Sequence, residues 1–210
     1  TRYSRSGPPV VVWNITKRSD LHCVHCYNDS AMKDYPGELT TGEAKKVIDD
    51  LAGFHVPALI FSGGDPLLRE DIFELASYSR QKGIRPILST SGVNIDETVA
   101  KKGKDSGIVY AGVSRDGGEA TNDRLRGVKG SYKGARQGLR FLKAQGIVCG
   151  IRFTMSKKTV ADLAFIFDLL EDEDIERGYF AHLVYSGRGE RFSREDLDHE
   201  ETRSAVDYIF

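Results

Sequence analysis

The chain has 210 residues, enough to bury one well-packed core, so we expect a single domain. Its formal net charge of −1 argues against a general nucleic-acid binder, which would carry a strong basic excess. No apolar stretch approaches the roughly 20 residues that span a bilayer, and three cysteines without a disulfide framework are typical of a reducing compartment. We therefore expect a cytoplasmic protein with neither a nucleic-acid nor a membrane partner.

Strand-like and helix-like patterns alternate along the whole chain. Strands are predicted from short apolar or β-branched runs at residues 10–16, 57–62, 85–90, 108–114, 147–155 and 179–185. Helices are predicted after the capping box Thr40-x-x-Glu43, from about residue 70, over residues 96–106, 131–145 and 159–171, and in the tail from residue 193.

Repeated strand–helix units with apolar strands predict an α/β fold, in which helices cover a parallel sheet. Periodicity leaves two architectures open, a partial (β/α) barrel and a doubly wound sheet. In both, functional groups belong at the carboxyl ends of the strands.

Two cysteines, Cys23 and Cys26, follow the first predicted strand with two residues between them. This spacing on a loop is compatible with zinc, a redox disulfide or an iron–sulfur cluster. A zinc site would also draw on His22 or His25, but ligands so close in sequence would crowd one tetrahedral ion. The third cysteine, Cys149, falls in a strand pattern and is predicted to be a small buried hydrophobe.

Glycine-rich or polar segments end or follow the later strands. They are Ser62-Gly63-Gly64-Asp65-Pro66, Ser89-Thr90-Ser91-Gly92, Ser114-Arg115-Asp116-Gly117, Arg152 within the fifth strand, and residues 182–189 after the sixth. Adjacent glycines let the backbone approach a ligand closely, although an ordinary turn uses the same residues.

In this order the segments resemble those of the radical S-adenosylmethionine enzymes, whose C-x-x-x-C-x-x-C signature holds a 4Fe–4S cluster. Cys23 and Cys26 match its second and third cysteines, and Ser19 stands at the first position. The later segments are similar to the family's Gly-Gly-Glu-Pro, Ser-Thr-Asn-Gly and Ser-Leu-Asp-Gly motifs. The resemblance implies a partial (β/α)6 barrel of parallel strands over residues 1–210, with Ser19, Cys23 and Cys26 at the metal.

The resemblance also implies S-adenosylmethionine as a cofactor. Its expected binding residues are His25, Tyr27, Gly63, Gly64, Asp65, Pro66, Ser89, Ser91 and Ser114. Asp65 stands in place of the glutamate of the motif that holds the cofactor's amino group. His25 is expected beside the adenine, whereas His22 is expected to be exposed to solvent.

Residues 38–41, 59–64, 123–130, 152–154 and 182–189 are closest to the subgroup that acts on iron tetrapyrroles in heme biosynthesis. This implies an oxidoreductase or lyase that makes a 5′-deoxyadenosyl radical with electrons from a flavodoxin- or ferredoxin-like donor. The expected catalytic residues on the substrate side are Arg152, His182 and Arg188. The two arginines are expected to bind peripheral carboxylates of the substrate. Arg191 is a further candidate, for which a surface salt bridge is the favoured interpretation.

Two alternatives stay open beside this interpretation. A peptide-modifying maturase of the same family would be favoured by a peptide-binding region upstream of Thr1. A binding protein without a cluster is compatible with Ser19, since a serine hydroxyl is a poor ligand for iron. The chain begins at Thr1 without Met and stops at Phe210 inside a helical pattern, so we expect a piece of a longer protein that lacks its cysteine-rich C-terminal domain.

Overall fold

The computed structural model describes residues 8–210, so the predicted start at Thr1 lies outside the described residues. Within that part of the chain, one parallel sheet has the strand order β1-β2-β3-β4-β5-β6. The strands are β1 (Val11–Thr16), β2 (Ala58–Gly63), β3 (Arg85–Thr90), β4 (Tyr110–Ser114), β5 (Val148–Met155) and β6 (Gly178–His182). The predicted parallel α/β fold is confirmed.

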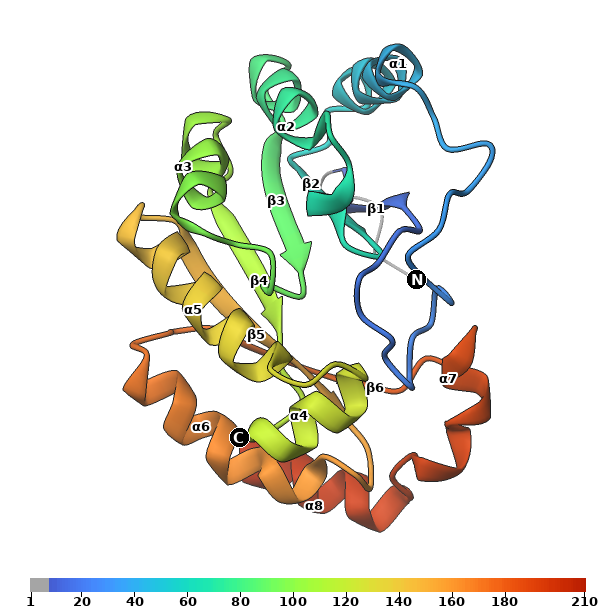
Figure 1. Ribbon diagram of the computed structural model, residues 1–210, viewed down its shortest axis with the longest axis vertical. Coiled ribbons are helices and arrows are strands. Elements are labelled where there is room, and N and C mark those ends of the chain that lie inside the picture. The colour runs from blue at the N-terminus through green and yellow to red at the C-terminus, as the bar shows by residue number, and fades with distance from the viewer. Residues whose placement is uncertain (1–7) are drawn as a thin grey trace.

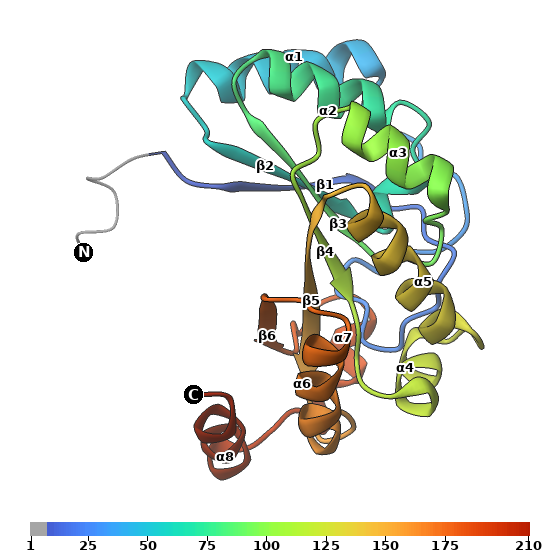
Figure 2. The ribbon, with the colours of Figure 1, turned by 90° about the vertical axis from the view of Figure 1, so that its left-hand side faces the viewer.

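The strand order separates the two architectures that periodicity left open. A doubly wound sheet reverses its strand order at a switch point, whereas here every strand from β2 onward pairs with the strand before it. Figures 1 and 2 show α1, α2, α3 and α5 along one side of the curved sheet. Among the described residues β1 and β6 are edges that do not pair with each other. The fold is therefore an open, partial barrel, and the doubly wound alternative is wrong.

The predicted helices are present, and the largest difference is in the tail, where the helix expected from residue 193 begins only at His199, after a 3-10 turn. The helices are α1 (Thr41–Gly53), α2 (Ile72–Gln81), α3 (Glu97–Asp105), α4 (Glu119–Arg126), α5 (Ser131–Ala144), α6 (Leu163–Asp172), α7 (Arg188–Arg191) and α8 (His199–Ile209), with 3-10 turns at Pro66–Leu68, Val160–Asp162 and Ser193–Glu195. The capping box of Thr40 and Glu43 is confirmed at the start of α1. Helices α4 and α7 were not predicted, because neither is long enough to show a clear apolar period.

The core lies between the sheet and its helices. Helix α5 buries Ala135, Leu139 and Leu142, as their helical spacing predicts. Each fully buried leucine contributes roughly 1.5–3 kcal/mol relative to an exposed one. Cys149 on β5 is confirmed as buried, and burial raises the pKa of its thiol to about 11.

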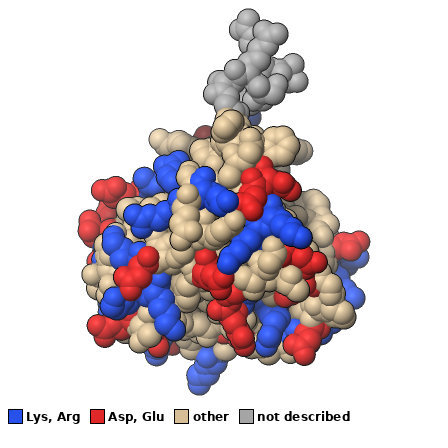
Figure 3. All heavy atoms as spheres, turned by 90° about the horizontal axis from the view of Figure 1, so that it is seen from above, with Lys and Arg blue, Asp and Glu red and all other residues tan. Residues whose placement is uncertain are grey.

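The outer face over α1 and α2 carries charges of both signs. Figure 3 shows lysine, arginine and acidic side chains interspersed on this face. Two of its ion pairs join α1 to α2, Lys45 with Glu74 and Lys82 with Asp49. In the part of the chain that the structure describes, no helix combines the length and apolar character needed to cross a bilayer.

The strand register brings the polar groups near the carboxyl ends of the strands together at one end of the sheet. Ser114 at the end of β4 pairs with Arg152 on β5, and Arg152 pairs with Tyr179 on β6. On the other side of the barrel, Asn14 on β1 pairs with Ser62 on β2. Side chains from distant parts of the sequence therefore meet above the same end of the barrel.

Candidate functional site

A cavity of about 410 Å³ lies at the carboxyl ends of the strands. Its wall includes Cys23, Cys26, Gly64, Ser114 and Arg152, so residues that lie on or follow four different strands meet at one cavity. The other predicted site residues in the wall are Ser19, His25, Tyr27, Gly63, Ser89, Ser91, His182 and Arg188. Asp65 and Pro66 are buried outside this described wall.

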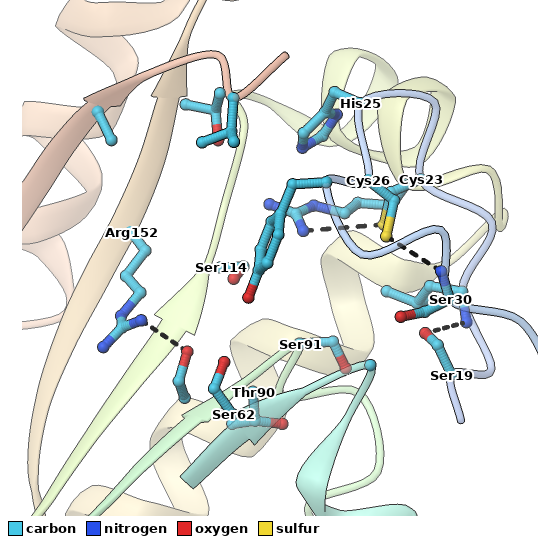
Figure 4. Close-up of a pocket in the computed structure, with 18 of the residues that line it drawn as sticks. Ser19, Cys23, His25, Cys26, Ser30, Ser62, Thr90, Ser91, Ser114 and Arg152 are labelled. Atoms are coloured by element: carbon cyan, nitrogen blue, oxygen red, sulfur yellow. Dashed lines mark hydrogen bonds between the residues drawn. The ribbon is translucent and has the colours of Figure 1, made fainter. Parts of the chain in front are cut away.

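Residues 17–31 after β1, here named the cysteine loop, are held by backbone contacts on both flanks. The amide of Ser19 donates to the carbonyl of Ala31 (3.1 Å), which closes the loop at its base. The amides of His22 and Val24 donate to carbonyls at the end of α4 at 3.0 and 2.9 Å. Figure 4 shows Cys23 and Cys26 on the same side of this loop. His22 is exposed, as predicted.

A buried ion pair between Arg126 and Asp116 lies against the cysteine loop. Arg126 Nη2 lies 2.6 Å from Asp116 Oδ2, and Arg126 Nη1 lies 3.8 Å from the Sγ of Cys23. The same carboxylate oxygen is 3.3 Å from His25 Nε2. Sequence reasoning did not assign Asp116 or Arg126 to the site, although both lie in stretches that carried the family resemblance. Only the packing of α4 against the loop brings them together.

Burial shifts the pKa of two groups on the loop. Burial raises the pKa of the Cys23 thiol, and the Arg126 guanidinium opposes this shift. Burial lowers the pKa of His25, although Asp116 favours the charged imidazole. At neutral pH the ligand-free site therefore holds a neutral thiol and a neutral imidazole, and a metal that binds Cys23 releases a proton.

The glycine pair at the end of β2 is required by close contact with β1 and with the residues that follow β1. A Cβ on Gly63 would lie 2.1 Å from the carbonyl oxygen of Thr16, and one on Gly64 would lie 2.0 Å from that of Arg18. The Gly64 amide donates to the Thr16 carbonyl at 2.8 Å. The close approach predicted toward a ligand is thus also an approach between two strand ends, which fixes the base of the cysteine loop.

Asp65 lies beneath the cavity, a placement that differs from its predicted role. One carboxylate oxygen accepts hydrogen bonds from Thr90 Oγ1 at 2.7 Å, the Ser91 amide at 2.9 Å and Ser91 Oγ at 2.8 Å. The other oxygen accepts from the Leu67 amide at 3.0 Å. The carboxylate therefore ties the turn after β2 to the end of β3. Pro66 begins the 3-10 turn beside it.

Ser114 and Arg115 point to opposite faces of the sheet. Ser114 lines the cavity, whereas Arg115 is fully buried under α5, with its guanidinium 3.8 Å from the ring centroid of Tyr132. Its Nη1 donates to the Tyr132 carbonyl, and burial lowers the pKa of Arg115 to about 10. Adjacent residues of a strand alternate in this way, so Arg115 takes no part in the cavity.

Arg152 lies across the cavity from the two cysteines (Figure 4). Its Nη1 donates to Ser89 Oγ at 2.6 Å, and its guanidinium lies 5.9 Å from the ring centroid of Tyr179. Within residues 8–210 no carboxylate comes within 4.0 Å of it. Gly112 leaves room for this position, since a Cβ there would lie 2.4 Å from Arg152 Nε.

Arg188 is turned to the cysteine loop instead. Its Nε donates to the Cys23 carbonyl at 2.8 Å, and its Nη1 contacts Asp29 Oδ1 at 2.9 Å and the Ser30 carbonyl at 3.0 Å. These contacts differ from the substrate role predicted for Arg188. Arg191 is exposed and outside the cavity wall.

His182 ends β6 at the rim of the cavity. Its Nδ1 lies 3.5 Å from one carboxylate oxygen of Asp196, whose other oxygen accepts a hydrogen bond from the Tyr185 hydroxyl. The acidic partner of His182 therefore comes from the tail, a pairing that the sequence did not indicate.

The residues present fit S-adenosylmethionine better than a three-thiolate cluster. Ser30 Oγ, Arg126 Nε and Arg152 Nε are buried polar atoms of cavity-lining residues without hydrogen-bond partners, and a polar ligand would satisfy such atoms. The hydroxyl of Ser19 accepts the Leu21 amide at 3.2 Å. Among the described residues no group of three His, Cys, Asp or Glu side chains is placed to hold a metal. The iron end of the site is one thiolate short.

Comparison with known proteins supports both the fold and the motifs. The radical SAM superfamily model matches residues 13–170. The chain is 50% identical to an Fe-coproporphyrin III synthase from Methanosarcina barkeri and 44% identical to a pre-heme d1 synthase from Dinoroseobacter shibae. Each alignment covers 99% of this chain and 52% of the relative. The chain thus spans about half the length of these curated relatives.

A solved structure of Streptococcus suis SuiB bound to its precursor peptide SuiA superposes with a TM-score of 0.81 at 17% identity. The superposition covers 97% of this chain and 46% of SuiB. At that identity the likeness shows the fold alone.

Proposed function

The chain belongs to the radical SAM superfamily, and on that premise we propose that it is the core of an enzyme that modifies side chains of an iron tetrapyrrole in heme biosynthesis. The superfamily uses a 4Fe–4S cluster and S-adenosylmethionine, which together supply a 5′-deoxyadenosyl radical when bound. A flavodoxin- or ferredoxin-like reductant and a cytoplasmic location are part of this proposal.

One observation carries the choice of substrate, the position of Arg152. It is a cavity-lining cation without a carboxylate partner among the described residues, and its Nε is a buried donor without an acceptor. Iron tetrapyrroles carry peripheral carboxylates, which guanidinium groups bind in a bidentate manner. Tyr179 and Ala181 line the cavity near Arg152 and offer apolar surface to the macrocycle. The names of the two relatives support the same substrate class.

The remaining residues have supporting roles in this proposal. His25 and Ser114 line the cavity beside the cysteines, where the neutral imidazole suits contact with an uncharged adenine. The two strand ends joined at Gly63 and Gly64 fix the floor. His182 has its Nδ1 against Asp196, and among the described residues no hydrogen bond involves its Nε2, so this nitrogen can bond to a substrate at the rim.

The alternatives gain less support. A peptide-modifying maturase shares the fold of SuiB, but fold alone does not identify a substrate. A binding protein without a cluster agrees with Ser19, and this alternative predicts that the tetrapyrrole binds whether or not iron and sulfide can be assembled.

Binding of an iron tetrapyrrole to the metal-free chain, followed by its absorption band, tests the substrate. We expect the free carboxylic acids to bind at least tenfold more tightly than their methyl esters, and Arg152→Met to remove most of that preference. Arg191→Met, which changes an exposed cation outside the cavity wall, is the matched control. Equal binding of acid and ester by the unaltered chain would overturn the proposal.

A further inference from the structure

The chain after β6 packs against the backbone of the cysteine loop. Residues 183–192, here named the exit segment, run from the end of β6 through α7. The backbone amides of Arg188 and Gly189 both donate to the carbonyl of Cys26, at 2.9 and 3.4 Å. The edge strands β1 and β6 do not pair, so these contacts join the first and last strand–helix units of the open barrel.

The approach of the two segments is close enough to require glycine. A Cβ on Gly187 would lie 2.7 Å from the carbonyl oxygen of Cys26, 2.8 Å from that of Tyr27 and 2.9 Å from the amide nitrogen of Asp29. Gly187 also has a positive φ of 57°, a conformation that favours glycine. The exit segment therefore lies directly against the backbone that carries the second cysteine.

The side chain of Arg188 spans the loop from the other direction. Its Nε donates to the carbonyl of Cys23 itself and its Nη1 to that of Ser30, four residues beyond Cys26, and Nη1 also pairs with Asp29. The Ser30 amide in turn donates to the Sγ of Cys26 at 3.4 Å. One guanidinium thus holds the two ends of the segment 23–30, which contains both thiols.

We propose that Arg188 is a positioning residue that clamps the cysteine loop to the exit segment, so that the Cys23 and Cys26 thiols stay fixed toward the cavity. The arginine acts through the loop backbone and not on substrate. The inference rests on contacts within the described residues and is independent of the tetrapyrrole substrate. Its consequence is that loss of Arg188 loosens the loop while the rest of the barrel stays folded.

The test uses the metal-free, reduced chain, with iodoacetamide as the probe and mass spectrometry to locate the label. We expect Arg188→Met to raise the labelling rates of Cys23 and Cys26 about tenfold, because several hydrogen bonds on the loop are lost. Cys149 is the internal reference, since it is buried and the pKa of its thiol is raised to about 11. A parallel rise at Cys149 would show general unfolding and would overturn the proposal of a local clamp.

Two further variants separate the clamp from a general effect of charge. Asp29→Asn removes only the ion pair and keeps a residue that tolerates the positive φ of 49° at this position, so we expect a smaller rise than with Arg188→Met. Arg191→Met removes a cation from the same short helix and should leave labelling unchanged. Equal labelling rates in Arg188→Met and the unaltered chain would overturn the proposal.

A second experiment measures how well the cysteine loop holds an iron–sulfur cluster. With Ser19→Cys in place, iron and sulfide per chain after anaerobic reconstitution should fall severalfold on adding Arg188→Met, and Arg188→Lys should recover part of the loss through its contact with Asp29. The melting temperature of the metal-free chain should change little on adding either Arg188→Met or Arg188→Lys. Full cluster content in Arg188→Met would contradict the clamp, whatever the outcome of the tetrapyrrole experiment.

Discussion

The two sides of the cavity differ in whether their charged side chains already have partners within the fold. On the cysteine side, which comprises the cysteine loop with Asp65, Asp116 and Arg126, carboxylates and carbonyls are bound to neighbouring segments. On the open side, formed by β5 and β6, Arg152 has no carboxylate partner among the described residues and Tyr179 is 56% exposed. A site that brings shared cofactors to a particular substrate needs this difference. The charged groups at the cofactor end are held in advance by partners within the fold, whereas Arg152 on the open side keeps its charge for a ligand.

The largest expected effect concerns Ser19, which stands where a third thiolate ligand is missing on the cysteine side. The chain as it stands should assemble little stable 4Fe–4S cluster and cleave S-adenosylmethionine slowly or not at all, whereas Ser19→Cys should restore both. A third thiolate replaces a hard, poor donor with a soft one. The measurement is iron and sulfide per chain, with 5′-deoxyadenosine released under dithionite. Equal cluster content in both versions would show that Ser19 is a competent ligand.

The buried ion pair should make the cysteine side sensitive to a single neutral substitution. Asp116→Asn leaves the Arg126 guanidinium buried without its counter-charge, so we expect a loss of about 3–5 kcal/mol in the free energy of unfolding. Denaturant unfolding of the metal-free chain measures this loss. A change below about 1 kcal/mol would mean that the pair is accessible to water, and the contrast between the two sides would weaken.

Asp65 offers a smaller test of the same side. Asp65→Asn keeps the shape of the side chain but places an NH2 group against some of the donors on Thr90, Ser91 and Leu67. We expect a loss of about 1–3 kcal/mol in the free energy of unfolding. Since the carboxylate lies outside the described cavity wall, affinity for S-adenosylmethionine, measured by calorimetry, should change less than stability does. The opposite result would return Asp65 to its predicted role as a cofactor ligand.

On the open side, a substitution should change ligand affinity more than it changes stability. Tyr179→Ala removes an exposed ring beside Arg152, so the free energy of unfolding should change by less than about 1 kcal/mol. Affinity for the iron tetrapyrrole should nevertheless fall severalfold, because the ring offers apolar surface to the macrocycle. Absorbance titration checks the affinity and thermal unfolding checks the stability. A large loss of stability with unchanged affinity would contradict the proposed division of the cavity.

Local sequence determined the elements and the order of the chemistry along the chain. The run from Arg85 to Thr90 forms β3 with the predicted bounds, and Thr40 and Glu43 cap α1. These features depend on neighbours a few residues away, through side-chain alternation and capping hydrogen bonds. The motifs after each strand could be placed at the mouth of the fold for the same reason, because parallel strands end at one edge.

Tertiary structure alone decided the rest. Each strand–helix unit has the same pattern in a barrel and in a doubly wound sheet, so periodicity left both open. The family resemblance implied the partial barrel, and strand pairing confirmed it. Residue type made Arg152, Arg188 and Arg191 substrate candidates, with a surface position favoured for Arg191. In the structure Arg152 and Arg188 both line the cavity, but the Arg188 guanidinium is bonded to the cysteine loop, and Arg191 is exposed. The roles of Arg152 and Arg188 depend on contacts between distant segments, Arg152 with Ser89 and Arg188 with Cys23, which no local period records.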